Sequence, residues 1–483
     1  MKKYLLLLLL SMASVIPTFA AIKHIRWGSS GDPLNGLTVT WRNNGLTDSI
    51  SWGYTSTYEK GVFSGIKRNG YSEFLFNYTF PTVTPGSAIF YKLYDSNTNS
   101  WGAQKKFMTA PPSNTTSFSF SVLGDSRDGL SVWNQVSTLA NAKKTDLSLF
   151  TGDIVADGAS GSQWDSWFNN SSAFLENNLI YLALGNHEAS SVPTYKNNFE
   201  LPKVNGSPLY YSFVYGNALF ITLNTEAPGD QAQATWLVST LASASANPNI
   251  VWKIINFHKP FYTIGTHSGE MNSYFNTWWK AFDDYGVDLI VNGHDHMYER
   301  TKPINRNVST TSPVTTYGSD PGQGRCQIVC GGAGAPLYTG APTWAIEKYQ
   351  SKYNYCRFTI NGPVLSDTTF DNNGNVIDAF SIVKNGGMTT GVNNNISVQQ
   401  FNKIKVFPNP IESEYKLTYF SSFIGEVTIK IFDVAGREIM SEKVLKDQEK
   451  LEYSNEMGTY AKGAYVFQII VGEQRDSQLV ILK

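Results

Sequence analysis

The sequence predicts a multidomain chain in which an α/β centre lies between two β-rich ends. The chain has 483 residues, more than a single hydrophobic core usually serves, so we expect several domains. Its centre holds apolar runs separated by helix-like segments, which is typical of the buried strands of an α/β sheet. Both ends show short alternating segments separated by turn residues, which is typical of antiparallel sandwiches.

The first twenty residues have the pattern of a secretory signal peptide. Lys2 and Lys3 precede an apolar run from Tyr4 to Ile16, and Thr18-Phe19-Ala20 offers a small-residue cleavage site. A retained membrane anchor is the alternative, but the apolar run is too short to favour it. No later segment is apolar for long enough to span a bilayer, so we expect no transmembrane anchor in the mature protein.

Charge and cysteine content exclude some classes of function. The formal net charge is −1 and the pI is about 6.6, so no broad basic surface for nucleic-acid recognition is expected. The three cysteines, Cys326, Cys330 and Cys356, form an odd and low count that argues against a disulfide framework. We interpret them as core or edge residues, with a bridge from Cys356 to one of the others as the alternative.

The segment 21–112 is expected to form a small antiparallel sandwich. Its candidate strands are Leu37–Trp41, Phe74–Phe80 and Ile89–Tyr94. Trp41 is expected to fill its core. His24, in the first strand, is predicted to be a structural or surface imidazole and not a metal ligand.

In the centre, five apolar runs each lead into a polar motif. The runs are Phe118–Leu123, Leu147–Thr151, Ile180–Leu184, Val251–Ile255 and Val287–Val291. The motifs are Gly124-Asp125, Gly152-Asp153, Gly185-Asn186-His187-Glu188, Asn256-Phe257-His258 and Gly293-His294-Asp295-His296. Because ligand sites of open α/β sheets lie beyond the carboxyl ends of the strands, we expect the five loops to meet. Carboxylates, an amide oxygen and imidazoles suit a pair of divalent or trivalent metal ions better than a soft thiolate site would.

Between these strands the sequence predicts four helices. They are expected at Ser131–Lys144, Trp164–Asn177, Ala232–Ala246 and Asn272–Tyr285. A strand–loop–helix order of this kind is what an α/β unit requires.

The order of the motifs, closed by Gly293-His294-Asp295-His296-Met297-Tyr298-Glu299-Arg300, resembles the calcineurin-like metallophosphoesterases and most closely their purple acid phosphatase branch. The resemblance spans roughly Ser119 to Ile382. It implies a four-layer α/β sandwich over residues 113–385 and two metal ions, whose identity among Fe, Zn, Mn and Mg stays open. The run Val83–Leu93 resembles the fibronectin type III-like amino-terminal domain of purple acid phosphatases, which implies that fold for residues 21–112.

The resemblance also implies the ligands. One metal takes Asp153, Asn186, His258 and His294. The other takes Asp125, Asp153 and His296, so that Asp153 bridges the two metals.

Further residues are expected beside the metals. By resemblance, His187 is the acid–base residue that contacts the substrate; the alternative is an imidazole that only orients a ligand. His267 lies nine positions after His258, where purple acid phosphatases have a substrate-facing histidine; the alternative is an exposed loop residue. Glu299 and Arg300 are expected to brace their loop through hydrogen bonds.

Two positions depart from the family pattern. Purple acid phosphatases have a tyrosine three residues after the bridging aspartate, where this chain has Ala156, and the wider family has a histidine where this chain has Arg127. The metal held by Asp125 therefore lacks the usual fourth protein ligand. No tyrosinate-to-iron colour is expected, and the case for ferric iron is weaker.

The sequence leaves two questions open at these positions. Asp128, Asp157 or additional water are alternatives for completing the metal shell. Arg127 is predicted to bind substrate through a phosphate oxygen, with an ion pair to Asp128 or Asp157 as the alternative.

From residue 403 the chain is β-rich again, after an Asn-rich linker over 386–402. The segments Val406–Pro410, Asp433–Arg437 and Gly463–Ile470 resemble the carboxy-terminal sorting domain of the type IX secretion system. This resemblance implies export through the periplasm of a Gram-negative bacterium, by the type IX machinery, to the medium or the cell surface. An accessory sandwich that binds a surface ligand is the alternative.

We therefore expect a secreted, metal-dependent phosphohydrolase acting on phosphate esters. The leading hypothesis is a phosphomonoesterase in which hydroxide bound to the dinuclear centre attacks phosphorus in line. The alternatives are a phosphodiesterase or nucleotide hydrolase on the same site, or a non-catalytic surface binding protein.

Overall fold

The computed structural model forms two compact units, residues 1–389 and 390–483. It describes residues 22–70, 73–308, 313–320, 322–384, 404–420, 424–433, 437–448, 450–471 and 474–483. The expected signal peptide (1–20) and linker (386–402) lie outside these residues. Among the described helices, none has the length and apolar character needed to cross a bilayer.

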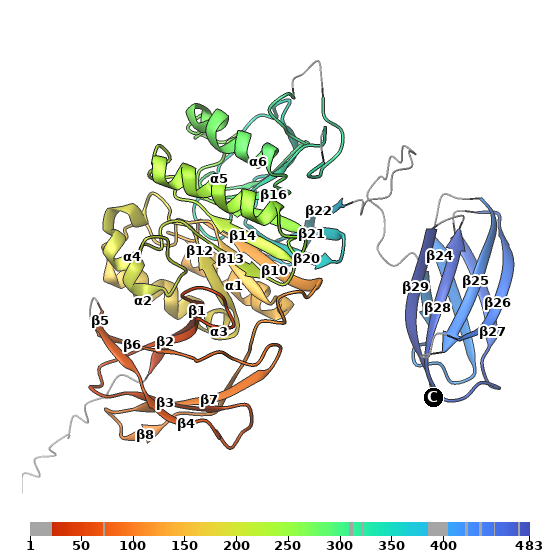
Figure 1. The fold of residues 1–483 in the computed structure, drawn as a ribbon, viewed down its shortest axis with the longest axis horizontal. Coiled ribbons are helices and arrows are strands. Elements are labelled where there is room, and N and C mark those ends of the chain that lie inside the picture. Colours follow the sequence, from red (N-terminus) through yellow and green to blue (C-terminus); the bar gives the residue numbers. More distant parts are fainter. Residues whose placement is uncertain are drawn as a thin grey trace, which may run out of the picture. The chain divides into compact units, whose positions relative to one another are not determined.

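The first part of the chain is a sandwich of two sheets (Figure 1, red to orange). Its strands are β1 (Lys23–Ser29), β2 (Leu37–Asn43), β3 (Ser49–Gly53), β4 (Gly61–Ser64), β5 (Ile66–Asn69), β6 (Phe74–Thr79), β7 (Ala88–Asp95), β8 (Ser100–Trp101) and β9 (Lys105–Met108). One sheet has the order β4-β3-β7-β8, with β9 paired to β7, and the other contains β1-β2-β6-β5. Trp41 is fully buried, as expected, and the ring of Trp27 stacks on Phe107 at 3.9 Å.

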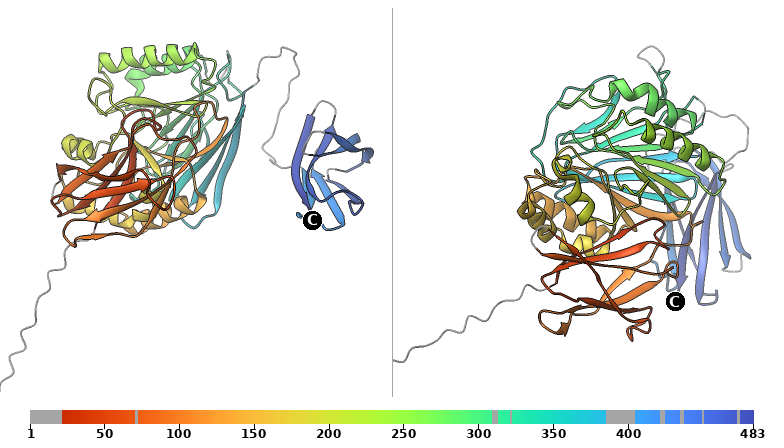
Figure 2. Two further views of the ribbon diagram at one scale, coloured as in Figure 1. Left: turned by 60° about the horizontal axis from the view of Figure 1, so that its bottom comes forward. Right: turned by 60° about the vertical axis from the view of Figure 1, so that its left-hand side comes forward.

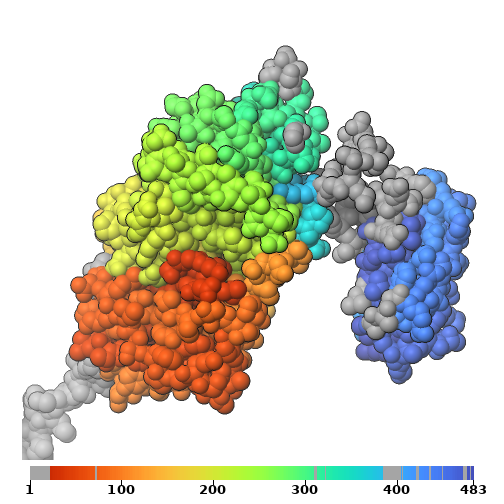
Figure 3. Space-filling view, in the orientation of Figure 1, coloured from red at the N-terminus to blue at the C-terminus, as the bar shows by residue number. Residues whose placement is uncertain are grey.

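One sheet of this sandwich continues into the centre of the molecule. The parallel pairing of β1 with β12 (Leu179–Leu182), in register at Trp27 and Leu179, produces a ten-stranded sheet with the order β22-β21-β20-β10-β11-β12-β1-β2-β6-β5. In the space-filling view the two regions are in direct contact (Figure 3). The sequence did not predict this continuity.

The centre consists of two sheets packed face to face. The other central strands of the ten-stranded sheet are β10 (Ser117–Leu123), β11 (Leu147–Phe150), β20 (Asn354–Asn361), β21 (Val364–Asp371) and β22 (Val376–Val383). The facing sheet contains β13 (Tyr211–Tyr215), β14 (Ala218–Thr222), β15 (Trp252–Asn256), β16 (Leu289–Asn292), β17 (Tyr298–Thr301), β18 (Cys326–Cys330) and β19 (Ile346–Gln350). It has the order β13-β14-β15-β16-β18-β17-β19.

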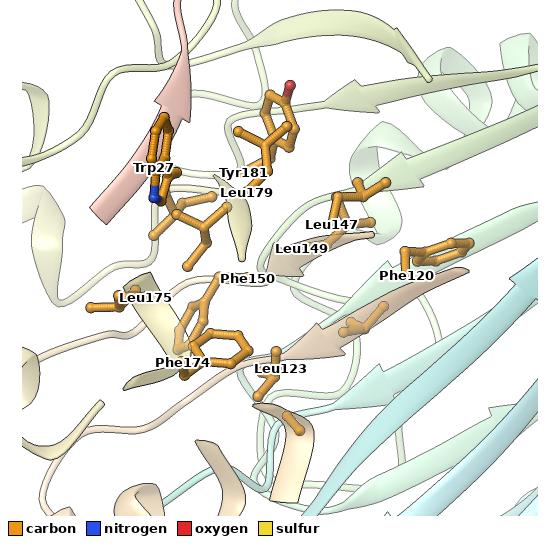
Figure 4. Close-up of a cluster of buried hydrophobic side chains, with 14 of the residues drawn as sticks. Trp27, Phe120, Leu123, Leu147, Leu149, Phe150, Phe174, Leu175, Leu179 and Tyr181 are labelled. Carbon is orange, nitrogen blue, oxygen red and sulfur yellow. The ribbon is translucent and has the colours of Figure 1, made fainter. Parts of the chain in front are cut away.

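Aromatic side chains join the two central sheets. Phe120 of β10 packs edge-on against Phe220 of β14, and Tyr181 of β12 stacks on Phe213 of β13 at 3.5 Å. Figure 4 shows this core around Phe120, Leu147, Leu149 and Tyr181. The five strands predicted to lead into the polar motifs all form, but they are divided between two sheets: β10, β11 and β12 in one, β15 and β16 in the other.

Helices cover the outer faces of the sheets (Figures 1 and 2). They are α1 (Leu130–Lys143), α2 (Gly161–Asn170), α3 (Ser172–Asn177), α4 (Val192–Asn198), α5 (Gln231–Ser245) and α6 (Lys280–Asp284), with short 3-10 turns at Glu188–Ser191 and Asn272–Tyr274 and a π-helical turn at Phe275–Trp279. Trp133 of α1 packs edge-on against Phe150 of the ten-stranded sheet. Leu237 of α5 and Phe282 of α6 belong to a second hydrophobic core, formed between these helices and the outer face of the seven-stranded sheet. The layers are therefore helix, sheet, sheet and helix.

Two predicted helices differ from the structure. The helix expected at Trp164–Asn177 is split into α2 and α3 because Ser171 leaves helical geometry, with φ −132° and ψ 15°. The Ser171 hydroxyl donates to the Trp167 carbonyl at the break. The segment Asn272–Tyr285 changes from 3-10 to π to α geometry and is not one α-helix.

The carboxy-terminal unit is also built from two sheets around one core. Its strands are β23 (Ile404–Phe407), β24 (Glu414–Phe420), β25 (Gly425–Asp433), β26 (Glu438–Lys446), β27 (Lys450–Glu456), β28 (Gly463–Val471) and β29 (Gln474–Leu482). The sheet orders are β23-β24-β27 and β26-β25-β28-β29.

All three cysteines are buried and free, so the alternative of a bridge from Cys356 is not realised. The Cys330 thiol lies 3.2 Å from Oδ1 of Asn354, and the Cys356 sulfur accepts from the Thr369 hydroxyl. They are core residues, as predicted.

Candidate metal centre

Side chains from both central sheets meet beyond the carboxyl ends of their strands. The loops after β10, β11, β12, β15 and β16 supply Asp125, Asp153, Asn186, His258, His294 and His296. Donor atoms of Asp153, His258 and His294 lie within 4.8 Å of one another. The same holds for Asp125, Asp153 and His296, so Asp153 is common to both groups. We refer to these as the His258 group and the His296 group.

Asn186 adds an oxygen donor to the His258 group. Its Oδ1 lies 2.9 Å from Nε2 of His258, and the Nδ1 atom of His294 lies 3.1 Å from that nitrogen. The His258 group thus comprises four side chains, against three in the His296 group.

Backbone carbonyls determine which imidazole nitrogens face the centre. Nδ1 of His258 lies 2.9 Å from the carbonyl of Thr151, and Nδ1 of His296 lies 2.8 Å from the carbonyl of Pro336. Because a carbonyl only accepts, both Nδ1 atoms carry hydrogen, and the Nε2 atoms are the nitrogens that face the centre. This arrangement is how proteins orient histidine ligands toward a metal.

Asp153 occupies the middle of the cluster and is buried. Its Oδ1 lies 3.3 Å from Nε2 of His258 and accepts from the backbone N–H of His187, while Oδ2 lies 3.6 Å from Nε2 of His187. Burial raises the pKa of Asp153, but His258 outweighs burial and the pKa falls below its ordinary value. Burial likewise lowers the pKa of His258, and Asp153 and Asp125 reverse this, raising it to about 10.

The backbone at three candidate ligands is held in the left-handed region. Asp125, Asp153 and His294 have φ values of 57°, 56° and 71°. Such conformations are uncommon outside glycine and cluster at functional sites. Gly293 lies where a Cβ atom would come within 2.2 Å of Oδ2 of Asp125, so only glycine allows this approach.

Glu188 connects two of the loops and was not assigned a role from the sequence. Its buried carboxylate accepts from the backbone N–H groups of Asp153, Ile154, Val155 and Gly185. Burial and the neighbouring Asp153 raise the pKa of Glu188 to about 7. Four main-chain donors on one carboxylate fix the Asp153 loop relative to the Asn186 loop.

Three further predicted site residues lie at the more exposed rim. The side chains of His187 and His267 are each 28% exposed, and that of Arg127 is 15% exposed. Nδ1 of His187 donates to the carbonyl of Ala156, which leaves its Nε2 free to face Asp153. His267 bonds to Asp295 through Nδ1 at 2.9 Å and packs on His294 with ring centroids 3.8 Å apart.

Arg127 forms an ion pair with Asp128, with Nη1 2.5 Å from Oδ2. This is one of the alternatives that the sequence left open for Arg127. The guanidinium also faces the centre: Nη2 lies 3.4 Å from Nε2 of His296 and Nε lies 3.5 Å from Oδ2 of Asp153. Asp157, the other open partner, accepts instead from the backbone of Ala159 and the hydroxyl of Ser190.

Two residues near the centre were missed. Oε2 of Glu270 lies 3.3 Å from Nε2 of His294, and Glu270, His267 and His294 form a third group of donors within 4.8 Å. Tyr338, from the loop between β18 and β19, stacks on His296. Neither belongs to a strand-end motif, although Glu270 lies only three residues after His267 in the chain.

The final motif is braced as predicted. The carboxylate of Glu299 accepts from the Thr263 hydroxyl and the Ile264 backbone, and Arg300 pairs with Asp378 at 2.7 Å. Burial raises the pKa of Glu299 to about 8. Both side chains fix the loop that carries His294 and His296.

The donors fit metal ions unequally. The His258 group offers oxygen and nitrogen atoms in a buried setting, and the buried Nε2 of His294 makes no hydrogen bond, although Oε2 of Glu270 lies 3.3 Å away. The His296 group has one donor fewer, and a guanidinium stands beside two of its members. The residues present therefore fit a metal at the His258 group fully and at the His296 group in part.

Comparison with known families agrees with this arrangement. Residues 122–298 match the model of the calcineurin-like phosphoesterases, and residues 405–483 match that of the secretion system C-terminal sorting domain.

Relatives and a solved structure extend the comparison. The chain is 30% identical over 228 residues to the phosphoenolpyruvate phosphatase of Allium cepa, covering 42% of this chain and 45% of that protein. It is 27% identical over 241 residues to the Fe(3+)-Zn(2+) purple acid phosphatase 12 of Arabidopsis thaliana, covering 44% and 49%. It thus spans about half the length of each of these two relatives. The purple acid phosphatase PPD1 from yellow lupin (Lupinus luteus) seeds shares the fold, with a TM-score of 0.65, 20% identity, and coverage of 75% of this chain and 74% of that one.

The predicted resemblances to the calcineurin-like metallophosphoesterases and to the sorting domain are thereby confirmed. The chain carries a calcineurin-like phosphoesterase domain that is similar in sequence to purple acid phosphatases and shares their fold, followed by a secretion-system sorting domain.

Proposed function

We propose that this protein is an exported, metal-dependent phosphomonoesterase. The observation that carries the proposal is the convergence of Asp125, Asp153, Asn186, His258, His294 and His296 from five loops on two sheets. His187 and Arg127 stand beside that cluster and are the more exposed.

Two metal ions are proposed, one held by the His258 group and one by the His296 group. When bound, such a pair supplies a water molecule of lowered pKa and positive charge against the phosphate oxygens. Asp153 belongs to both groups, so it holds the two positions together. Glu188 preserves this geometry by fixing the backbone of the Asp153 loop.

His187 is proposed to deliver a proton to the leaving oxygen. Its Nδ1–H is engaged by the Ala156 carbonyl, so only Nε2 can exchange a proton with a substrate. Arg127 is proposed to bind phosphate, since a guanidinium presents paired donors to an oxyanion. His267 is proposed to line the substrate side, because it packs on His294 with part of its ring exposed.

The names of two relatives support the monoester preference and the dinuclear centre, respectively. One is called a phosphoenolpyruvate phosphatase, and phosphoenolpyruvate is a phosphomonoester. The other is an Fe(3+)-Zn(2+) purple acid phosphatase, which supports a dinuclear centre. Because Ala156 stands where the purple enzymes have tyrosine, Zn, Mn or Mg is proposed in preference to ferric iron.

Export is proposed to proceed through the periplasm of a Gram-negative bacterium by the type IX machinery. The match of residues 405–483 to a sorting domain supports this route. We also propose domain boundaries at 21–112, 113–385 and 403–483, with a fibronectin type III-like fold for the first. The two-sheet sandwich of β1 to β9 supports that assignment.

The test compares p-nitrophenyl phosphate with bis(p-nitrophenyl) phosphate. The full chain is stripped with chelator and resupplied with Zn, Mn, Fe or Mg. We expect metal-restored hydrolysis of the monoester, loss of activity in His258→Asn, and retention in His24→Asn, whose imidazole lies outside the centre. A strong diester preference would establish the phosphodiesterase alternative, and inactivity with every metal would refute the proposal.

A further inference from the structure

The Arg127 guanidinium lies against the donor atoms of the His296 group. Nη2 is 3.4 Å from Nε2 of His296, and Nε is 3.5 Å from Oδ2 of Asp153. Nε2 is the one His296 nitrogen left for a ligand, because Nδ1 bonds to the Pro336 carbonyl. Oδ1 of Asp153 faces Nε2 of His258 and accepts from the backbone N–H of His187, so Oδ2 is the oxygen near the guanidinium, where Nε2 of His187 also lies.

The guanidinium is only partly neutralised where it stands. Nη1 pairs with Asp128, whose side chain is 43% exposed. The Nε atom is buried and makes no hydrogen bond. Because Nε makes no hydrogen bond and lies near Oδ2 of Asp153, the guanidinium is attracted to that carboxylate oxygen.

Two features disfavour the binding of a metal ion at the His296 group. Asp125, Asp153 and His296 offer three donors, and Ala156 supplies no side-chain donor. A cation placed among them would also be close to the charge of Arg127, and repulsion between like charges at such distances is substantial inside a protein. Neither disadvantage applies to the four members of the His258 group.

We propose that Arg127 competes with metal for Oδ2 of Asp153 and Nε2 of His296, so that the two metal sites have very different affinities. The His258 group binds metal tightly. The His296 group binds metal weakly, and filling it requires the guanidinium to leave. The inference builds on the proposed dinuclear function, and it concerns metal affinity alone.

The test is a metal titration without substrate. The full chain, stripped with chelator, is titrated with Zn²⁺ by calorimetry, and bound metal is counted after gel filtration. In the wild type we expect one tight equivalent and a second that is weaker by roughly 100-fold. In Arg127→Ala the second equivalent tightens about tenfold or more, while the first changes by less than about twofold.

Matched variants distinguish the effect of the Arg127 contacts from the effect of any positive charge near the centre. Lys259 lies near the His258 group: its Nζ is 3.7 Å from Oε2 of Glu270, which in turn is 3.3 Å from Nε2 of His294. Among the described residues, Lys259 forms no ion pair with a member of the His296 group. Lys259→Ala should leave the affinity of the weaker, second equivalent unchanged. Arg127→Gln, which removes the charge but keeps an amide near Asp128, should behave as Arg127→Ala does and serves if that variant folds poorly.

A second readout reports where the metals bind. With two equivalents of Mn²⁺, electron paramagnetic resonance should show an exchange-coupled pair in Arg127→Ala and isolated ions in the wild type at the same concentration. Two wild-type equivalents of nearly equal affinity, or an unchanged ratio in both Arg127 variants, would overturn the inference. Because no substrate is present, failure of phosphatase activity leaves this result intact, and the reverse also holds.

Discussion

The ring of Tyr338 stacks on the imidazole of His296, with centroids 4.1 Å apart and planes inclined by 24°. The backbone N–H of Tyr338 also donates to the carbonyl of His296 at 3.0 Å. The same loop provides the Pro336 carbonyl that engages Nδ1 of His296. One loop therefore holds this imidazole by its face and by its nitrogen.

Removing the Tyr338 ring should loosen His296. An aromatic pair of this kind contributes about 0.5–1.5 kcal/mol, which corresponds to roughly a 2- to 12-fold weakening of metal at the His296 group in Tyr338→Ala. Tyr338→Phe keeps the ring and should bind metal as the wild type does. Calorimetric titration measures both, and an equal loss in the two variants would show that the hydroxyl matters and the stacking does not.

His187→Asn should separate catalysis from metal binding. Loss of a general acid typically lowers kcat by about 10²- to 10⁴-fold. Because His187 belongs to neither metal group, metal content should be unchanged. Steady-state kinetics with p-nitrophenyl phosphate, together with metal analysis, give the two readouts. A variant that loses metal as well would assign His187 an orienting role instead.

Glu188→Gln should destabilise the protein. The carboxylate accepts from four backbone N–H groups, whereas an amide offers one oxygen and turns an NH₂ group toward the remaining donors. Leaving buried donors unsatisfied costs about 1–3 kcal/mol each. Thermal unfolding of the metal-free chain should show a lower Tm, while Glu347→Gln, on an exposed side chain, should leave it unchanged. An unaltered Tm in Glu188→Gln would contradict the bracing role.

The buried His24 should make stability depend on pH. Burial, with smaller contributions from Arg26 and Arg42, lowers the pKa of His24 from 6.5 to about 3. The unfolded chain therefore takes up a proton between these values and the folded chain does not, so stability is full above pH 6.5 and is lost as pH falls toward 3. The slope contributed by one such group is at most about 1.4 kcal/mol per pH unit.

The variant His24→Asn tests this dependence. Asparagine tolerates the left-handed backbone that His24 adopts, with φ 53°. Unfolding free energies of the wild type and the variant, measured from pH 7 to pH 4, should converge as pH falls. Parallel pH curves would refute the contribution of His24.

Local sequence patterns were enough to predict the five central strands that lead into the polar motifs, and the loops that follow them. Apolar runs such as Leu147–Thr151 are recognisable because both faces of these strands are covered. The pairing of β1 with β12 was not predictable, because it joins residues far apart in the chain and leaves no periodic signal. The break at Ser171 and the π-helical turn at Phe275–Trp279 depend on tertiary packing, which overrides helix propensity.

For the site, the motifs predicted which side chains would meet but not how they are supported. Glu188 lies within a recognised motif, yet its four backbone contacts depend on the approach of two loops. Tyr338 reaches His296 from a loop without any motif of its own. Arg127 was predicted near phosphate, and its approach to Asp153 and His296 appears only in three dimensions. The ligand roles themselves stay predictions.

The strand pairing at Trp27 and Leu179 limits how this enzyme can be dissected or rebuilt. A catalytic fragment lacking residues 21–112 would present β12 as a bare edge, and unpaired strand edges are templates for aggregation. The amino-terminal sandwich thus serves as edge protection for the catalytic sheet. Replacing this sandwich with an unrelated tag, or expressing the catalytic part alone, would leave the edge of β12 unpaired. A minimal active fragment should therefore begin near Lys23, where β1 starts.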